Sequence, residues 1–130
     1  MVIQSGSKGK VKLVQATIED ISNLQEELDD DLGFKQCGTL RVAVSPDNVQ
    51  RLDADYRVAS QEGVDVSYLS VSEAQELLPW LHFPDPSSKI TFTKNDGFID
   101  PTILASSYQS AGRRHGLETR FNQKVTEIGP

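Results

Sequence analysis

The sequence is poor in the residues that build disulfides and metal sites. It contains one cysteine, Cys37, and two histidines, His82 and His115, in 130 residues. A single cysteine excludes an internal disulfide and a cysteine-based zinc site, and neither histidine has a second metal ligand at a suitable spacing. We therefore expect no metal site in this chain, and the cysteine usage favours a reducing, cytoplasmic location.

An excess of positive charge and a long apolar run are also missing. Thirteen Lys and Arg residues stand against nineteen Asp and Glu residues, which gives a formal net charge of −6. This balance disfavours binding to the phosphates of nucleic acid. No stretch reaches the roughly 18 apolar residues that cross a bilayer, and the first residues show no signal-peptide pattern. We expect neither a nucleic-acid partner nor insertion into a membrane.

The nine glycines include no pair spaced as G-x-G. The sequence therefore has neither a dinucleotide-binding fingerprint nor a Walker loop. Residues 5–10 (SGSKGK) resemble a phosphate loop only superficially, because no strand precedes them and the order of glycine, lysine and serine differs. We expect no cradle for cofactor phosphates here.

The remaining pattern is an alternation of helices and strands. Residues 1–11 are small and polar at their centre and are expected to form a flexible lead-in, while residues 12–130 are expected to form one unit. Apolar residues at three- and four-residue steps predict a helix from about Lys12 to Gly33. Strands are predicted over residues 34–44, with a bulge at Gly38, and over 64–69, 89–94 and 117–128. Further helices are predicted to be capped by Ser45, Ser72 and Asp100.

This order predicts an α/β (α+β mixed) fold, in which helices cover a partly antiparallel sheet. The proline-rich loop around Trp80 and Phe83 is expected to place apolar side chains over the core. Cys37 is expected to be a buried structural residue, and Asp53 and Asp55 to lie on an exposed helix surface. No catalytic residue is expected from these patterns.

Several motifs in the second half of the chain resemble the D-amino-acid-oxidase (DAO) superfamily of FAD-dependent oxidoreductases, which includes sarcosine and dimethylglycine dehydrogenases and glycine oxidase. Residues 95–101 (NDGFIDP), 112–118 (GRRHGLE) and 124–128 (KVTEI) are similar to the family's D-G-x-(V/I)-D-P turn, the following helix and the next strand. Residues 33–40 (GFKQCGTL) and 72–78 (SEAQELL) are similar to an earlier strand and helix of the family.

The resemblance implies that the chain is an internal fragment of a larger enzyme, without the G-x-G-x-x-G region and the C-terminal part. Residues 12–100 would belong to the substrate domain, and residues 101–130 would form a helix and a strand that lead into the flavin domain. The parent would bind FAD and oxidise the carbon–nitrogen bond of a secondary or tertiary amine or amino acid of the sarcosine, dimethylglycine or glycine type. The implied cofactor contact in this chain is Val125, whose backbone would touch the adenine part of FAD; the fragment alone would bind no FAD and be inactive.

Two other functions fit the residues. The acidic run Glu26, Glu27, Asp29, Asp30 and Asp31 could dock a basic partner, which would make the chain a non-catalytic interaction module. A hydrolase that uses Cys37 as its nucleophile is the third hypothesis. Truncation would also expose surfaces through which the chain could self-associate.

Overall fold

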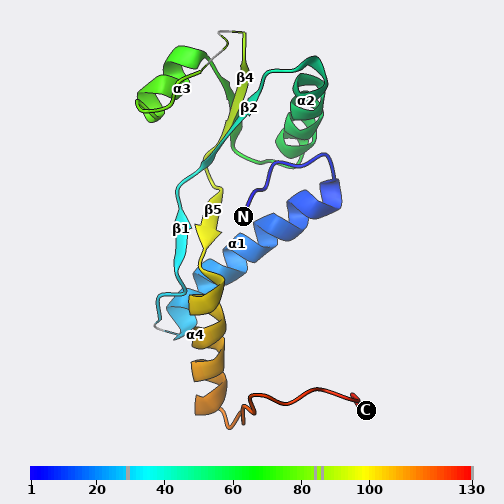
Figure 1. Ribbon diagram of the computed structural model, residues 1–130, viewed down its shortest axis with the longest axis vertical. Helices are drawn as coiled ribbons and strands as arrows, with labels where there is room; N and C mark the ends of the chain where they lie inside the picture. Colours follow the sequence, from blue (N-terminus) through cyan, green and yellow to red (C-terminus); the bar gives the residue numbers. More distant parts are fainter. Residues whose placement is uncertain (29, 84, 86, 130) are drawn as a thin grey trace.

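The computed structural model of the protein describes residues 1–28, 30–83, 85 and 87–129 (Figure 1). Four helices and five short strands lie within these residues. In chain order they are α1 (Lys8–Leu28), β1 (Phe34–Gln36), β2 (Thr39–Ala43), α2 (Pro46–Gln61), β3 (Val66–Leu69), α3 (Val71–Leu77), β4 (Lys89–Thr93), β5 (Gly97–Ile99) and α4 (Pro101–Arg114).

The centre of the fold is a three-stranded antiparallel sheet with the order β2-β4-β3. β4 pairs with β2, where Arg41 lies opposite Thr91, and with β3, where Tyr68 also lies opposite Thr91. In Figure 1, α2 and α3 lie on opposite sides of these strands. The predicted mixed fold with a partly antiparallel sheet and covering helices is confirmed, and the strands predicted after Phe34, Val64 and Lys89 all contribute to this sheet.

A second, two-stranded ladder continues from the sheet. β1 pairs antiparallel with β5, so the chain from β1 to β2 runs beside the chain from β4 to β5. The two ladders are separated at Gly38, where the backbone amides of Cys37 and Gly38 both donate to the carbonyl of Asp96, at 3.2 and 2.8 Å. Gly38 has a φ of 76°, a conformation that glycine adopts without strain. The expected strand over residues 34–44 is therefore divided in two at Gly38, where residues 37–38 lie opposite residues 94–96.

Apolar packing forms two clusters of buried residues in the part of the chain that the structure describes. One lies between the N-terminal residues, α1 and α2, and contains Ile3, Val11, Ile18, Ala59 and Val64. The other lies under α3 and joins Ala74, Phe83 and Ile90. The prediction that the loop before β4 packs on the core is confirmed for Phe83. It is wrong for Trp80, which is 78% exposed.

The N-terminal residues differ from the expected flexible lead-in. Ile3 and Gln4 are buried, and α1 begins at Lys8 rather than near Lys12. The backbone amide of Gly97 donates to the carbonyl of Met1 at 3.2 Å, so the first residues run alongside β5. Residues 5–10 are small and polar, and this composition predicts a flexible segment. It does not reveal that Ile3, which precedes them, is covered by α1 and α2.

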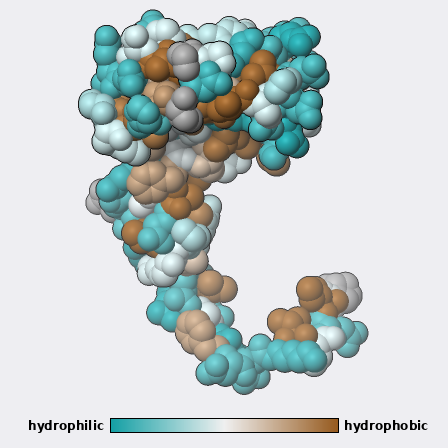
Figure 2. All heavy atoms as spheres, turned by 45° about the horizontal axis from the view of Figure 1, so that its top comes forward, coloured by the Kyte–Doolittle hydropathy of each residue, from teal (hydrophilic) through white to brown (hydrophobic). Residues whose placement is uncertain are grey.

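The last residues also differ from the prediction. No strand forms over residues 117–128 in the described part of the chain, and these residues extend away from α4 as an exposed segment (Figures 1 and 2). Leu117 is held by its amide, which donates to the carbonyl of Gly112 at 2.9 Å, but β-prone residues further on have no adjacent strand among the described residues. A strand needs hydrogen-bonding partners on a neighbouring strand, so the alternation of side chains alone does not produce one.

The helix caps are mostly those that the sequence predicts. The Ser45 hydroxyl accepts from Asn48 N at the start of α2, and the Asp100 carboxylate accepts from Thr102 N at the start of α4. The sequence predicts a cap at Ser72, which has Gln75 three residues further on, whereas the capping box of α3 is formed by Ser70 and Glu73. Both pairs have the required spacing, and the one that directly follows the end of β3 closes the helix. Over the described residues, no helix combines the length and apolar character needed to cross a membrane.

Candidate functional site

A buried polar junction joins the N-terminal residues to the turn between β4 and β5. Asp96 is fully buried, and its Oδ1 accepts a 2.7 Å hydrogen bond from the backbone amide of Ile3. Loss of solvation raises the pKa of Asp96, and the hydrogen bond from Ile3 opposes this rise. The Asp96-Gly97 turn therefore acts as an anchor for residues 1–4 as well as a chain reversal.

Gln4 extends this junction onto the sheet. Its side-chain oxygen accepts from the Thr91 hydroxyl at 2.9 Å, and its backbone carbonyl accepts from Arg41 Nη1 at 3.2 Å. The Gln4 Nε2, Thr93 Oγ1 and Asp96 Oδ2 atoms are buried without a hydrogen-bond partner in the described residues. Buried polar atoms without hydrogen bonds are costly to stability, and three of the four such side-chain atoms found among the described residues lie in this junction.

Charged residues of α2 pair with the sheet face beneath them. Arg41 and Asp55 are 2.8 Å apart, and Lys89 lies 2.7 Å from Asp53. The Tyr68 hydroxyl donates to Asp53 at 2.8 Å. The expectation that Asp53 and Asp55 lie on an exposed helix surface is wrong, because both carboxylates face the sheet and are about three-quarters or more covered, with side-chain exposures of 26% and 15%.

These contacts shift two pKa values. The hydrogen bond from Lys89, followed by that from Tyr68, lowers the pKa of Asp53. Burial first, and the nearby Asp53 carboxylate second, raise the pKa of Tyr68 to about 12. At neutral pH Asp53 is thus ionised and Tyr68 neutral, a combination that holds α2 on the sheet and leaves neither group poised for proton transfer.

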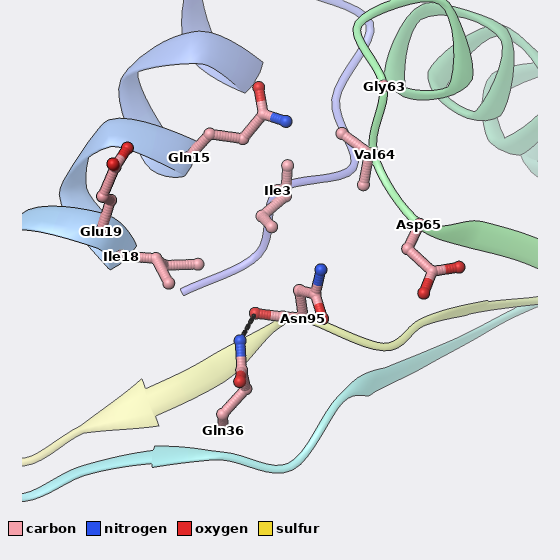
Figure 3. A pocket seen from close by; sticks show the side chains of 9 residues that line it. All are labelled: Ile3, Gln15, Ile18, Glu19, Gln36, Gly63, Val64, Asp65 and Asn95. Carbon is pink, nitrogen blue, oxygen red and sulfur yellow. Dashed lines mark hydrogen bonds between the residues drawn. The ribbon is translucent and has the colours of Figure 1, made fainter. Parts of the chain in front are cut away.

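A cavity of about 410 Å³ lies between α1 and the ladder of β1 and β5 (Figure 3). Five separate segments contribute to its wall: the N-terminal residues, α1, the connection from α2 to β3, β1 and the turn before β5. Its lining consists of apolar, amide and acidic side chains together with one glycine, namely Ile3, Gln15, Ile18, Glu19, Gln36, Gly63, Val64, Asp65 and Asn95. None of the nine carries a positive charge.

The residues singled out by the sequence do not meet in this structure. Cys37 is an exposed free thiol, so the expectation that it is buried is wrong. His82 is exposed in the loop before β4, and His115 is the exposed C-cap residue of α4. No hydrogen bond joins either histidine to Cys37 within the described residues, and no group of potential ligands among them could hold a metal ion. Val125 is 74% exposed and lies in the extended terminal segment.

The N-termini of three of the four described helices are capped by side chains. Those of α2, α3 and α4 are occupied by the side chains of Ser45, of Ser70 with Glu73, and of Asp100, respectively. A phosphate group needs free backbone amides at such a terminus, and a capping carboxylate would repel it. Neither these three N-termini nor a G-x-G loop, which the sequence lacks, offers a cradle for the phosphates of FAD.

A comparison of the sequence with known protein families defines its class. The family described as "FAD dependent oxidoreductase", DAO, matches residues 2–130. The chain therefore belongs to the DAO family, as the motif at residues 95–101 indicated.

Individual relatives agree with this assignment. The chain is 24% identical to the mitochondrial dimethylglycine dehydrogenase of Rattus norvegicus over 119 residues, which are 92% of this chain and 14% of the relative. It is 25% identical over 123 residues to the formaldehyde-forming 4-methylaminobutanoate oxidase of Paenarthrobacter nicotinovorans, covering 95% of this chain and 15% of that enzyme.

A solved structure shares the fold. The glycine oxidase of Geobacillus kaustophilus superposes with a TM-score of 0.74 at 24% identity, over 88% of this chain and 32% of the glycine oxidase chain. The present chain thus spans about a seventh of the two sequence relatives and about a third of the glycine oxidase chain.

Sequence reasoning missed both the junction and the cavity. Asp96 was recognised as a turn residue, but its burial depends on Ile3, which lies 93 positions away. Gln15 and Gln36 carry no local signal at all, because single amides on a helix and a strand are normally surface residues.

Proposed function

We propose that this chain forms part of the substrate domain of a longer FAD-dependent oxidoreductase that acts on the carbon–nitrogen bond of an amine or amino acid. The family match over residues 2–130 carries this proposal, because it extends over nearly the whole chain. Substrates of the sarcosine, dimethylglycine or glycine type are the candidates, since the relatives' names include dimethylglycine, 4-methylaminobutanoate and glycine. The oxidation itself, removal of a hydride from the carbon beside the nitrogen, would be supplied by the flavin.

The role of this chain is to supply the sheet β2-β4-β3 and its covering helices. The sequence has no G-x-G loop, so we expect that the isolated chain does not bind FAD. Titration of FAD fluorescence with the 130-residue protein should show no saturable change at micromolar concentrations. Saturation in that range would overturn this part of the proposal, and riboflavin would show whether such binding requires the phosphates and adenine.

The enzymatic part of the proposal is tested on the complete open reading frame that contains this sequence. The purified product should carry FAD and reduce an artificial electron acceptor when dimethylglycine, sarcosine or glycine is added. Trimethylglycine is the matched control, because its quaternary nitrogen has no lone pair to form the iminium product. An FAD-containing product that none of the three amines reduces would argue against this substrate class.

Residues 117–128 have a separate place in the proposal. In the longer enzyme we expect them to join a neighbouring strand of the flavin domain, with the backbone of Val125 touching the adenine part of FAD. Val125→Pro would remove the backbone donor and prevent pairing, and should weaken retention of FAD by the complete enzyme. Val125→Ile is the control, because it keeps the backbone N–H donor and allows strand pairing. Equal FAD content in the two variants would refute the contact.

Two minor parts of the proposal concern the surroundings of the protein. A cytoplasmic location is proposed because Cys37 is an exposed free thiol, which a reducing compartment preserves. Self-association of the isolated chain is proposed because several large apolar side chains on α4 and after it are exposed, among them Tyr108, Phe121 and Ile128.

A further inference from the structure

The Asp96 carboxyl group is buried beneath residues 1–4 and has few hydrogen-bond partners. Its Oδ1 accepts from the backbone amide of Ile3 at 2.7 Å, and the residue is fully buried. Within the described residues its Oδ2 is buried and accepts no hydrogen bond. A buried carboxylate needs several donors or a paired cation to stay ionised, so this environment favours the neutral, protonated acid.

The charged groups near Asp96 are engaged elsewhere or do not pair with it. Arg41 on β2 lies 2.8 Å from Asp55 of α2, and the Met1 amine donates to a backbone carbonyl of β5. Among the described residues, none of the other charged groups on elements that border the turn or the adjoining cavity forms an ion pair with Asp96; they are Glu19 on α1, Lys35 on β1, Asp65 before β3 and Lys94 after β4.

Residues 1–4 are the part of this junction that can move away from Asp96. They belong to no helix or strand of the described structure, and hydrogen bonds hold them to the sheet and to the turn before β5. The apolar side chain of Ile3, which packs against α1 and α2, favours the closed state. Opening would bring water to Asp96 Oδ2, and also to Gln4 Nε2 and Thr93 Oγ1, which lack partners among the described residues.

The sign of the pH effect follows from burial. Burial raises the pKa of Asp96 above its ordinary value of 3.8, while the hydrogen bond from Ile3 is the largest of the opposing effects. When residues 1–4 lift away, the carboxyl group becomes solvated and its pKa returns towards the ordinary value. The closed state therefore holds a proton that the open state has already lost. This preference for the closed state is complete below pH 3.8 and is lost as the pH rises through the raised pKa of Asp96.

We propose that Asp96 is a pH-sensitive clasp: its neutral form holds residues 1–4 against the turn before β5, and its ionisation shifts them towards an open state. Ile3 and Asn95 both line the cavity beside α1 (Figure 3). Opening of residues 1–4 therefore removes one wall of this cavity and widens it. The clasp lies wholly within this chain and does not depend on a flavin.

The test is a pH titration of the isotope-labelled protein from pH 4 to 9, followed by nuclear magnetic resonance. The ¹³C signal of the Asp96 carboxyl group reports its ionisation. Exchange of the Ile3 amide with water, relative to an unstructured amide at the same pH, reports opening. As Asp96 ionises, protection of the Ile3 amide should fall about fivefold or more, because a buried carboxylate oxygen is left unpaired. The amides of β4 should keep their protection.

Two results of this titration would overturn the proposal. One is constant protection of the Ile3 amide over the whole pH range. The other is an Asp96 carboxyl group that titrates in the ordinary range of an exposed acid, as it would if an internal water molecule donated to Oδ2.

Matched variants separate Asp96 from other titrating groups. Asp96→Asn keeps an oxygen that accepts from the Ile3 amide and carries no charge, so this amide should stay protected at every pH. Asp20→Asn removes one charge from an exposed position on α1 and should keep the pH dependence of the original protein. The Met1 amine, a second titratable group at the turn, is present in both variants. If Asp96→Asn still lost protection with rising pH, Met1 and not Asp96 would be responsible and the proposal would be wrong.

A third variant keeps the proposal testable if Asp96→Asn disturbs the fold. Ile3→Pro leaves Asp96 in place and removes the backbone amide that donates to it, so residues 1–4 should stay open at every pH. The Asp96 carboxyl group should then titrate in the ordinary range of an exposed acid, while the amides of β4 stay protected. An unchanged titration of Asp96 in Ile3→Pro would show that residues 1–4 do not govern its ionisation.

Discussion

β4 and residues 117–128 are both rich in β-forming residues, yet only β4 forms a strand. Ile90 on β4 is 1% exposed, whereas Val125 and Ile128 are 74% and 90% exposed. β4 has a partner strand on each side, and helices lie over both faces of its sheet. Within the described residues, no strand lies beside the terminal segment. The difference shows that strand formation in this chain depends on neighbours and not on side-chain alternation.

α4 occupies an intermediate position between these two regions. It forms a full helix because its N-cap Asp100, its Pro101 and the residues of its last turn act locally. Its apolar side chains are only partly covered, with Ile103 at 42% and Tyr108 at 53% exposure. A helix satisfies its own backbone hydrogen bonds, so it persists where a strand does not.

The largest predicted effect is a difference in the free energy of unfolding between a variant of the sheet and a variant of the terminal segment. Ile90→Ala removes a side chain that is packed against Ala74 and Phe83, and should lower the free energy of unfolding by about 2 to 5 kcal/mol. Val125→Ala is the matched truncation in the exposed segment and should change it by less than about 0.5 kcal/mol. Urea unfolding followed by circular dichroism measures both. Similar losses in the two variants would contradict the comparison.

The next effect tests whether α4 depends on its own cap. Asp100→Ala removes the acceptor for Thr102 N and Ile103 N, at 2.8 and 3.3 Å, and should cost about 1 kcal/mol. Hydrogen exchange of the α4 amides measures this locally. Asp100→Asn retains the capping oxygen and should restore most of the protection. If the alanine variant exchanges no faster than the original protein, tertiary contacts and not the cap hold α4.

A smaller effect concerns how α2 is held on the sheet at high pH. The pKa of Tyr68 is raised to about 12, so the unfolded chain loses this proton at lower pH than the folded protein does. The contribution of Tyr68 to folding stability is therefore complete below its ordinary pKa of 10, and it is lost as the pH rises through about 12.

Tyr68→Phe is the variant that tests this. It should remove the highest-pH step from the tyrosinate absorbance of the folded protein, which has three tyrosines, and should reduce the loss of stability between pH 10 and 12. Tyr108→Phe, on the exposed side of α4, is the control. Persistence of the highest-pH step in Tyr68→Phe would refute the assignment.

The smallest effect on stability, with a separate effect on association, is expected in the terminal segment. Phe121→Ser with Ile128→Ser should change the free energy of unfolding by less than about 0.5 kcal/mol, because both side chains are exposed. The same pair should reduce self-association, measured by light scattering over a range of protein concentrations. Unchanged association would show that the chains self-associate through another surface.

Most helices and the sheet strands could be predicted from local patterns. Ser45 and Asp100 mark the starts of helices through hydrogen bonds to backbone amides two or three residues further on. The errors share a different cause. Trp80 was expected in the core and Cys37 to be buried, but burial depends on what the rest of the chain places beside a residue. Asp53 was expected to face solvent because its partner, Lys89, lies 36 positions along the chain.

The sequence by itself determined the class of this protein: its motifs identified the DAO family, and its caps and periodicities defined four helices and the strands of the central sheet within the described residues. Only the tertiary structure decided that residues 1–4 are anchored by Asp96, that Asp53 and Asp55 bind the sheet, and that five separate segments line one open cavity. The physical reason is the distance along the sequence between the residues that make contact. Caps and turns are settled by atoms a few residues apart, whereas burial, ion pairing and cavities arise between residues that are distant in the sequence and meet only when the chain folds.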